Sequence, residues 1–285
     1  MSDLKIVRTI PELRATVTAW RRDGQTVALV PTMGALHEAH MTLMQEARSR
    51  ADRVVATIFV NPTQFAENED LSTYPRREAK DIARLQQDEI DLLFAPHVSE
   101  IYPDGFATNV TVKGVSEGMC GDHRPGHFAG VATVVTKLLL QTLPDVALFG
   151  EKDFQQLQVI KSLTRDLDIP VKIIGVPTVR EPDGLAMSSR NTHLSADERI
   201  LAPVLHQILT EAAIKISAGD DIQQVCSAAV IGLREAGFAP VEYFEVRDAA
   251  TLAVPEQNSG PKQSLRILTA AWLGATRLID NIAIA

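Results

Sequence analysis

Short apolar runs alternate with amphipathic segments along the first two-thirds of the chain, and this alternation restricts the fold more than any other feature. The runs are rich in branched residues and lie at Val27–Pro31, Val54–Val60, Asp91–Phe94, Val146–Phe149 and Val171–Val176. Runs this short are typical of strands buried in a parallel sheet. The segments between them have helical patterns and lie at Met41–Ser49, Glu78–Glu89, Val131–Gln141 and Phe154–Asp166. The order β-α-β-α predicts an α/β fold with a doubly wound parallel sheet and helices on both of its faces.

The pattern changes after Pro182-Asp183-Gly184. Ser195-Ala196-Asp197-Glu198 has the form of a capping box, which predicts a long helix from there to about Ser217. A second helix is predicted over Asp221–Ala236, and three strands follow it, at Val241–Arg247, Leu265–Trp272 and Arg277–Ile282. We therefore expect a second, smaller α+β domain and place the boundary near residues 177–184.

Composition excludes several classes of protein. The 285 residues include 28 Lys and Arg against 36 Asp and Glu, a net charge of −8, whereas nucleic-acid binding needs a basic face. No uncharged stretch approaches the roughly 18–20 apolar residues of a membrane span, and the N-terminus has no signal-peptide pattern. The two cysteines, Cys120 and Cys226, form no CxxC or Cys/His cluster, which is typical of a protein from a reducing compartment. We therefore expect a cytoplasmic protein with no nucleic-acid or membrane partner.

The loops that follow the predicted strands are the first place to look for chemistry, because ligands of doubly wound sheets bind beyond the carboxyl ends of the strands. The first such loop is Pro31-Thr32-Met33-Gly34-Ala35-Leu36-His37-Glu38-Ala39-His40. Gly34 permits a tight turn, and the helix that follows presents backbone N–H groups to an anion. The spacing of His37 and His40 places both on one helix face, where imidazoles can stabilise a phosphate. Surface histidines at a helix start, or part of a metal site without a nearby third ligand, are the alternatives.

Two later segments carry a cation beside hydroxyl or carboxyl groups. Gly150-Glu151-Lys152-Asp153 can meet a triphosphate and its magnesium, and Ser188-Ser189-Arg190 offers donors to phosphate oxygens. Taken singly, the first is also consistent with a charged loop of mutual ion pairs and the second with a helix-capping turn. Together with the histidine pair they favour transfer of a nucleotidyl group from ATP, which depends mainly on positioning and charge stabilisation at phosphorus.

At these residues the sequence resembles the pantothenate synthetase family, also called the pantoate–β-alanine ligases. The first loop is similar to the HIGH signature of the nucleotidylyltransferase superfamily, and Met187–Arg190 is similar to its KMSKS counterpart. Further segments narrow the resemblance to the family and occur in order over essentially the whole chain: Phe59–Phe65, Tyr74–Arg76, Arg124–Val131, Phe149–Leu157, Val176–Arg180, Ala271–Gly274 and Arg277–Asn281. The resemblance implies a Rossmann-like domain at residues 1–178 that binds ATP and pantoate, and a smaller C-terminal α+β domain at residues 179–285 that carries the Met-Ser-Ser-Arg loop.

The activity that the resemblance implies is a two-step ligation. The carboxylate of pantoate attacks the α-phosphorus of MgATP, which gives pantoyl adenylate and pyrophosphate. The amine of β-alanine then attacks the acyl carbon, which gives pantothenate and AMP. The family resemblance also implies a homodimer.

The resemblance assigns a role to each matching residue. His40 is the expected catalytic acid, and His37, Lys152 and Arg190 are expected to act with it at the phosphates. Gln64 is expected to bind pantoate and to lie near β-alanine, and Gln156 to be a second pantoate contact. The expected ATP contacts are Met33, Gly34, Ala35, Leu36, His37, Glu38, Ala39, His40, Gly150, Glu151, Lys152, Asp153, Val179, Met187, Ser188, Ser189 and Arg190. Mg²⁺ is expected with ATP, and no protein ligand is assigned to it.

One position departs from the family pattern. Ala39 stands where the family usually has glycine, and a methyl group there predicts weaker ATP binding with retained activity. Two other functions remain as alternatives: a nucleotidylyltransferase that stops after the first transfer, and a non-catalytic nucleotide-binding regulator on the same fold. The Gln64 and Gln156 segments argue against the first, and the presence of His40, Lys152 and Arg190 argues against the second. Size, acidity and the lack of an anticodon-binding extension exclude an aminoacyl-tRNA synthetase.

Overall fold

The computed structural model describes residues 4–66, 69, 71–255 and 264–284, and it divides into two compact units. Unit 1 comprises residues 1–112, 124–151 and 159–177, and unit 2 comprises residues 113–123, 152–158 and 178–285. The long C-terminal segment of unit 2 begins at Thr178. The two shorter segments of unit 2 are not anticipated by a division into residues 1–178 and 179–285.

Unit 1 is built on a six-stranded sheet in the order β1-β4-β3-β2-β5-β6. Its strands are β1 (Lys5–Val7), β2 (Val27–Thr32), β3 (Arg53–Ile58), β4 (Leu92–Phe94), β5 (Val146–Gly150) and β6 (Lys172–Val176). All neighbouring strands are parallel, with Val27 opposite Arg53 and Val146 opposite Lys172. The predicted doubly wound parallel sheet is confirmed.

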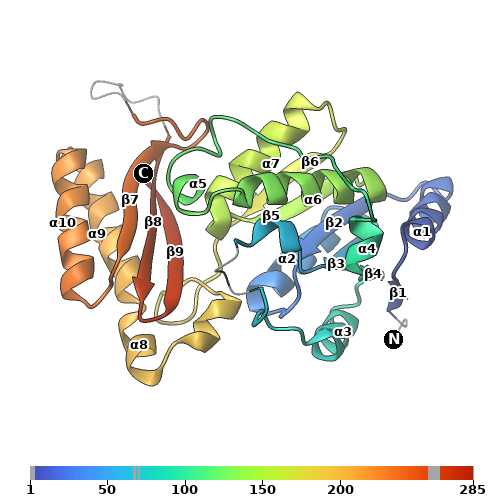
Figure 1. Ribbon diagram of the computed structural model, residues 1–285, viewed down its shortest axis with the longest axis horizontal. Helices are drawn as coiled ribbons and strands as arrows, with labels where there is room; N and C mark the ends of the chain where they lie inside the picture. The colour runs from blue at the N-terminus through green and yellow to red at the C-terminus, as the bar shows by residue number, and fades with distance from the viewer. Residues whose placement is uncertain (1–3, 67–68, 70, 256–263, 285) are drawn as a thin grey trace. The chain divides into compact units, whose positions relative to one another are not determined.

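Helices cover both faces of this sheet, with α2 and α3 on one side and α6 and α7 on the other (Figure 1). The helices of this part of the chain are α1 (Ile10–Arg22), α2 (Glu38–Arg48), α3 (Glu78–Gln87), α4 (Val98–Ile101), α6 (His127–Thr142) and α7 (Phe154–Asp166), and 3₁₀ turns lie at η1 (Pro62–Gln64) and η2 (Glu151–Asp153). α1 begins with a capping box between Thr9 and Glu12. Met44 of α2 and Leu85 of α3 pack with Val30 of β2 in one apolar cluster. Nearly every residue of α6 is buried, which places this helix deep within its unit.

Several elements of unit 1 differ from the prediction, among them the short helix α4, which was not predicted. β1 was not expected, because three residues at a sheet edge give too short a pattern to separate from a loop. α6 begins at His127 rather than Val131, because Gly126, with φ = +82°, supplies the left-handed residue at which the helix starts. The other predicted strands and helices of this unit occur within a few residues of their expected bounds.

Unit 2 contains a three-stranded antiparallel sheet in the order β7-β8-β9, as the smaller α+β domain requires. Its elements are α5 (Cys120–His123), η3 (Ser189–His193), α8 (Ala196–Leu201), α9 (Val204–Ser217), α10 (Ile222–Glu235), β7 (Val241–Asp248), β8 (Leu265–Leu273) and β9 (Thr276–Ile284). The first turn of α7 also belongs to it. Apolar side chains of α9 and α10 pack with those of the sheet in a single core.

The single long helix predicted to end near Ser217 is in fact two helices. The Ser195–Glu198 capping box is present, but α8 ends at Leu201 and α9 begins after Pro203, because proline cannot continue the hydrogen-bond ladder of a helix. Within the described residues, the run Ala196–Ser217 is long and apolar enough by length and composition to cross a membrane. Leu205 and Leu209 of this run lie in the core of unit 2, and a buried core helix meets the same criterion.

Candidate active site

The loop after β2 is the first part of the candidate site, and it lies at the switch point of the unit 1 sheet. β2 and β5 are neighbours, but β2 leads through α2 to β3 and β5 leads through α7 to β6 on the other side. Ligands of doubly wound sheets bind beyond the carboxyl ends of two such strands. Gly34 (φ = +83°) and Ala35 (φ = +51°) both adopt the left-handed conformation, so the chain turns sharply before α2. A Cβ atom on Gly34 would lie 3.0 Å from Asp81 Oδ2 and 3.1 Å from Ile58 Cγ2, and these close approaches also favour glycine.

A buried carboxylate on α3 fixes this turn. Asp81 Oδ2 accepts the N–H of Ala35 and Asp81 Oδ1 accepts the N–H of Leu36, both at 2.9 Å, and only 3 % of Asp81 is exposed. Arg84, one turn later, donates to the carbonyl of Leu36 at 3.0 Å and pairs with Glu38. The sequence did not single out either residue, because a carboxylate that serves backbone groups has no motif of its own. One indication of its role was available: Asp81 lies four residues before Leu85, so the two side chains share the buried face of the helix.

We expect Asp81→Asn to disturb this loop without abolishing the fold. An asparagine amide turns a donor toward one of the two N–H groups, which leaves that group unsatisfied at a cost of about 1–3 kcal/mol. The free energy of unfolding falls by that amount, and the KM for ATP rises because the loop loses its fixed form. Thermal or urea unfolding and steady-state kinetics measure the two effects. Asp88→Asn, at the end of the same helix, is the matched control, and an ATP KM that does not differ between the two variants contradicts the expectation.

The two histidines of the first loop are close neighbours at the start of α2. Their ring centroids lie 4.1 Å apart, and the backbone N–H of His37 donates to Nδ1 of His40 at 3.3 Å. A ring nitrogen that accepts a hydrogen bond carries no proton, so the neutral His40 ring carries its proton on Nε2. His40 is therefore built to donate from Nε2. Within the described residues, no group of three or more His, Cys, Asp or Glu could hold a metal ion, so the metal-site alternative has no support there.

Gln64 lies beside the same loop. It is buried in η1, its Nε2 donates to the sulfur of Met33 at 3.2 Å, and its Oε1 accepts from Asn61 at 3.0 Å. The absence of a side chain at Gly130 permits this packing, because a Cβ atom there would lie 2.3 Å from the carbonyl oxygen of Thr63. A residue expected at pantoate and a residue expected at ATP are thus in direct contact.

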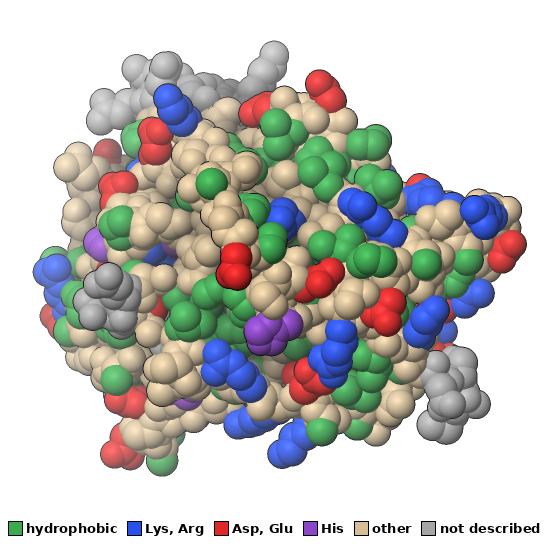
Figure 2. All heavy atoms as spheres, turned by 45° about the vertical axis from the view of Figure 1, so that its right-hand side comes forward, with side chains coloured by type: hydrophobic (Ala, Val, Ile, Leu, Met, Phe, Trp, Pro, Cys, Tyr) green, Lys and Arg blue, Asp and Glu red, His purple; other side chains and the backbone are tan. Residues whose placement is uncertain are grey.

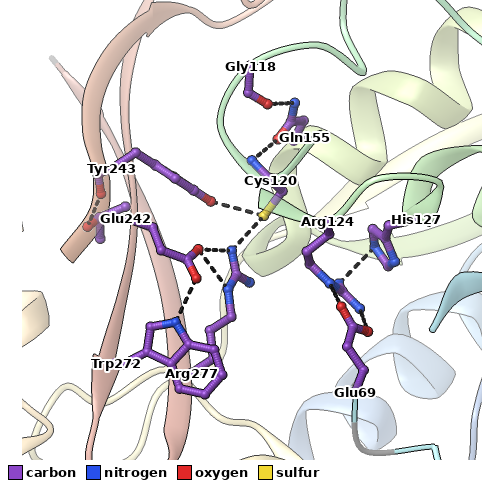
Figure 3. A network of polar contacts seen from close by, with 11 residues as sticks. Glu69, Gly118, Cys120, Arg124, His127, Gln155, Glu242, Tyr243, Trp272 and Arg277 are labelled. Atoms are coloured by element: carbon purple, nitrogen blue, oxygen red, sulfur yellow. Dashed lines mark hydrogen bonds and ion pairs between the residues drawn. The ribbon is translucent and has the colours of Figure 1, made fainter. Parts of the chain in front are cut away.

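Arg124 and His127 contact each other (Figure 3), and both lie within hydrogen-bond distance of the carbonyl oxygen of Gln64. Arginine cannot accept, so its 3.0 Å contact makes His127 Nε2 the acceptor and leaves Nδ1 to donate to the Gln64 carbonyl at 2.8 Å. Arg124 also forms an ion pair with Glu69 at 2.6 Å. These contacts fix the loop that leads into α6, which begins at His127.

The segment after β5 passes from unit 1 to unit 2. Gly150 ends the strand and Glu151 is the last residue of that segment of unit 1, whereas Lys152, Asp153 and Gln156 belong to unit 2. Lys152 Nζ lies 3.9 Å from Asp153 Oδ2, a long ion pair that leaves the ammonium group able to meet another anion. The predicted cation and carboxylate are therefore both at the end of a parallel strand.

The Met-Ser-Ser-Arg loop follows a small hairpin in unit 2. Arg180 and Ala186 form its isolated antiparallel bridge, and the N–H of Met187 donates to the carbonyl of Val179 at 3.0 Å. Ser188 caps η3, since its hydroxyl accepts the N–H of Arg190 at 3.3 Å. The helix-capping role is therefore present for Ser188. The side chains of Ser189 and Arg190 are half-buried.

A second buried network in unit 2 involves none of the predicted site residues (Figure 3). Arg277 donates to the sulfur of Cys120 at 3.3 Å and pairs with Glu242 at 2.7 Å, and Tyr243 Oη lies 3.1 Å from the same sulfur. Burial raises the pKa of Tyr243 well above its usual range. Burial also raises the pKa of Glu242, but the hydrogen bond and charge of Arg277 outweigh it and the net shift is downward. Glu242 therefore remains ionised and holds Arg277 in place.

The predicted site residues are divided between the units. Unit 1 contains Met33–His40, Gln64, Gly150 and Glu151, and unit 2 contains Lys152, Asp153, Gln156, Val179 and Met187–Arg190. Within unit 1 Gln64 contacts Met33, and within unit 2 the N–H of Met187 donates to the carbonyl of Val179. On the face shown in Figure 2, basic and acidic side chains are interspersed, which differs from the continuous basic surface typical of nucleic-acid binding.

Comparison with known proteins identifies the family to which this chain belongs. A family model described as pantoate-beta-alanine ligase matches residues 5–283. The chain belongs to the pantoate–β-alanine ligase family. It is 60 % identical over 279 residues to the pantothenate synthetase of Paramagnetospirillum magneticum, with 98 % of this chain and 97 % of that one covered. It is 52 % identical to the pantothenate synthetase of Rhodospirillum rubrum, with both chains covered completely.

Solved structures of the family have the same fold. The pantothenate synthetase of Thermus thermophilus matches with a TM-score of 0.91 at 43 % identity and 99 % coverage of both chains. The pantoate-beta-alanine ligase of Francisella tularensis, solved with beta-gamma ATP and beta-alanine, matches with a TM-score of 0.82 at 34 % identity and covers 98 % of this chain and 97 % of that one. The protein is accordingly an ATP-dependent ligase that condenses pantoate with β-alanine to pantothenate.

Proposed function

We propose that His40, His37, Lys152 and Arg190 carry the adenylation half-reaction of this ligase. The pantoate carboxylate oxygen attacks the α-phosphorus, a P–O bond forms, and the bond to pyrophosphate breaks with its electron pair on the leaving oxygen. His40 donates a hydrogen bond to the phosphates from Nε2 and His37 lies beside it. Lys152 and Arg190 offset the charge that develops on the phosphate oxygens, which is the main requirement of such a reaction. The remaining residues of Met33–His40, Gly150–Asp153, Val179 and Met187–Ser189 contact ATP.

The observation that carries this proposal is the hydrogen bond from His37 N–H to His40 Nδ1. It fixes the tautomer and the direction of the ring, so Nε2 is a prearranged donor. Prearranged donors stabilise a transition state without reorganisation during the reaction. The helix that begins at Glu38 adds its own N-terminal N–H groups at the same place.

Gln64 and Gln156 are the proposed pantoate contacts. Pantoate has hydroxyl groups and a carboxylate, and a glutamine amide can both donate to and accept from such groups. The bonds of Gln64 to Met33 and Asn61 fix its amide, so it can present a defined face to pantoate and to β-alanine. In the second half-reaction the β-alanine amine attacks the acyl carbon, a C–N bond forms, the amine loses a proton, and AMP leaves as the C–O bond breaks.

Magnesium is proposed to enter as the MgATP substrate. Mg²⁺ is usually held by one or two carboxylates together with substrate phosphates and water. Glu151 and the half-exposed carboxylate of Asp153 at the end of β5 fit this partial role, and the described residues contain no larger acidic cluster for a resident ion. We also propose that the ligase is a homodimer in the cytoplasm. The free thiols of Cys120 and Cys226 are consistent with that compartment.

Pyrophosphate exchange into ATP tests the adenylation assignment directly. We expect exchange that requires pantoate, followed by AMP release only after β-alanine is added. Exchange without AMP release would remove β-alanine as the acceptor. A folded preparation that binds ATP but shows no exchange would favour the nucleotide-binding regulator.

Ala39→Gly should tighten ATP binding. Ala39 is the second residue of α2, and its methyl group lies in the segment proposed to contact the nucleotide. We expect the KM for ATP to fall about tenfold, the lower end of the effect of one methyl group in a binding pocket, with kcat little changed. Thermal unfolding of the variant controls for the intrinsic cost of glycine in a helix, about 1 kcal/mol. An unchanged or higher KM in a stable variant would count against the expectation.

A further inference from the structure

Two adjacent residues of β9 contact two different segments of unit 2: Asn281 bonds Lys152 of the proposed ATP site, and Asp280 bonds the hairpin that leads to the Met-Ser-Ser-Arg loop. Successive side chains of a strand point to opposite faces, so two neighbours can serve two segments. Both residues are 4 % exposed. The two lie in unit 2 together with the segments that they contact.

Asn281 holds the backbone of Lys152. Its Nδ2 donates to the carbonyl oxygen of Lys152 at 2.9 Å. The next residues are attached to the same unit, because the Arg266 guanidinium lies 3.9 Å from the ring centroid of Phe154 and the Gln155 amide bonds the loop at residues 115–120. Lys152 is therefore fixed by contacts within unit 2, although it lies only two residues after the end of strand β5 of unit 1.

Asp280 holds the hairpin that precedes the Met-Ser-Ser-Arg loop. Its two oxygens accept from Arg180 at 2.6 and 2.9 Å, and Arg180 donates again to the carbonyl of Gly184 at 3.0 Å. His206 Nδ1 lies 3.6 Å from the same carboxylate. Burial raises the pKa of Asp280, but the nearby His206 and the hydrogen bonds and charge of Arg180 outweigh burial and the net shift is downward, so the carboxylate is ionised near neutral pH.

The loop itself is tied to this hairpin. Asn191 donates to Glu181 Oε1 at 2.8 Å and to the carbonyl of Ala186 at 3.1 Å, and Arg199 pairs with Glu181 at 2.5 Å. A displacement of Arg180 would therefore be transmitted through the hairpin to Ser188–Arg190. A buried ion pair such as Arg180–Asp280 is weak evidence for stability by itself, since its desolvation offsets much of its attraction. The effect of this pair that the structure shows is to fix the position of Arg180 and of the hairpin that contains it.

We propose that Asn281 and Asp280 are positioning residues for adenylation: Asn281 sets the place of Lys152, and Asp280 sets the place of the Ser188–Arg190 loop. Through these contacts a single strand, β9, sets the positions of both proposed phosphate-binding cations, Lys152 and Arg190. This inference rests on the proposed roles of Lys152 and Arg190. It adds that adenylation requires a fixed distance between the Lys152 ammonium group and the Arg190 guanidinium group.

A double-mutant cycle tests the Asn281 part. We expect Asn281→Ala to lower kcat of pantoate-dependent ATP–pyrophosphate exchange by about 10- to 10²-fold, as for a small misplacement of a catalytic group. Thr269→Val is the matched control, because Thr269 is also buried and bonds a backbone carbonyl, that of Tyr243, at 2.9 Å in the same sheet. In a Lys152→Met background, Asn281→Ala should cause little further loss, since residues that act as one unit are not additive.

The outcomes separate the two proposals. Full additivity of Asn281→Ala with Lys152→Met, or an equal loss in Thr269→Val, overturns the positioning role of Asn281 and leaves the role of Lys152 intact. If Lys152→Met alone leaves exchange unchanged, the proposed function of Lys152 fails first.

The Asp280 part is tested by Asp280→Asn with and without Arg190→Met. Non-additive losses of exchange support it, and additive losses overturn it. If Asp280→Asn does not fold, Arg180→Lys replaces it, since lysine keeps the charge but cannot make the paired contact. A wild-type exchange rate in a folded Arg180→Lys variant also overturns this part.

Discussion

Lys152→Met is expected to lower the rate of pantoate-dependent ATP–pyrophosphate exchange by about 10²- to 10³-fold, the usual effect of removing one electrostatic donor from a transition state. Methionine keeps much of the length of the side chain and removes its charge. Because the side chain pairs only at 3.9 Å with Asp153, its ammonium group makes little contribution to stability and the fold should be unaffected. Isotope exchange measures the rate, and thermal unfolding checks the fold.

Lys161→Met is the control for this variant, because Lys161 is exposed on α7, the helix that follows the η2 turn containing Lys152. It should retain the wild-type rate. A rate loss confined to KM for ATP, with kcat preserved, would show that Lys152 binds the ground state and transition state equally, contrary to the proposed role.

Replacing His40 should give two different results that depend on which ring nitrogen is imitated. The amide of asparagine can keep an acceptor near the Nδ1 position, where the N–H of His37 is bound, but it has no donor at the Nε2 position. We expect His40→Asn to fold normally and to lose about 10²- to 10³-fold in kcat for exchange. Glutamine reaches the Nε2 position with an N–H donor, so His40→Gln should retain more activity even though it loses the acceptor for the N–H of His37.

The comparison of these two variants is the measurement, with thermal unfolding recorded for both. Equal losses in the two variants would indicate that the His40 ring acts through its shape or through its hydrogen bond with His37, and not through a donor at Nε2. Higher activity in His40→Asn than in His40→Gln would contradict the tautomer inferred for His40.

Much of the fold could be predicted because the strands of the parallel sheet are buried on both faces and the helices are amphipathic. Each leaves a local pattern, and the bounds of α7 were predicted to the residue. The break between α8 and α9 at Pro203 could have been predicted from the same rules, since proline rarely lies inside a helix. The edge strand β1 could not, because its three residues carry no period.

The site divides along similar lines. The residues proposed to touch a ligand lie in motifs at strand ends, so the roles proposed for His37, His40 and Lys152 could be inferred from the sequence. Residues that act on the backbone of those motifs were not: Asp81 serves two N–H groups and Asn281 serves one carbonyl, and each contact joins segments far apart in the sequence. The membership of Lys152 in unit 2 also depends on such distant contacts. A sequence pattern gives the neighbours of a residue along the chain, and these contacts are made across it.

The interleaving of the two units has a consequence for how the protein can be divided. The six segments alternate between the units, so the chain passes from one to the other five times. A fragment cut at residue 178 would leave the C-terminal piece without Phe154, on which Arg266 stacks, and without Cys120, to which Arg277 donates. Neither unit is therefore a separable module that could be exchanged between proteins as one stretch of gene. Gene fusion or recombination that preserves this fold must retain almost the entire reading frame.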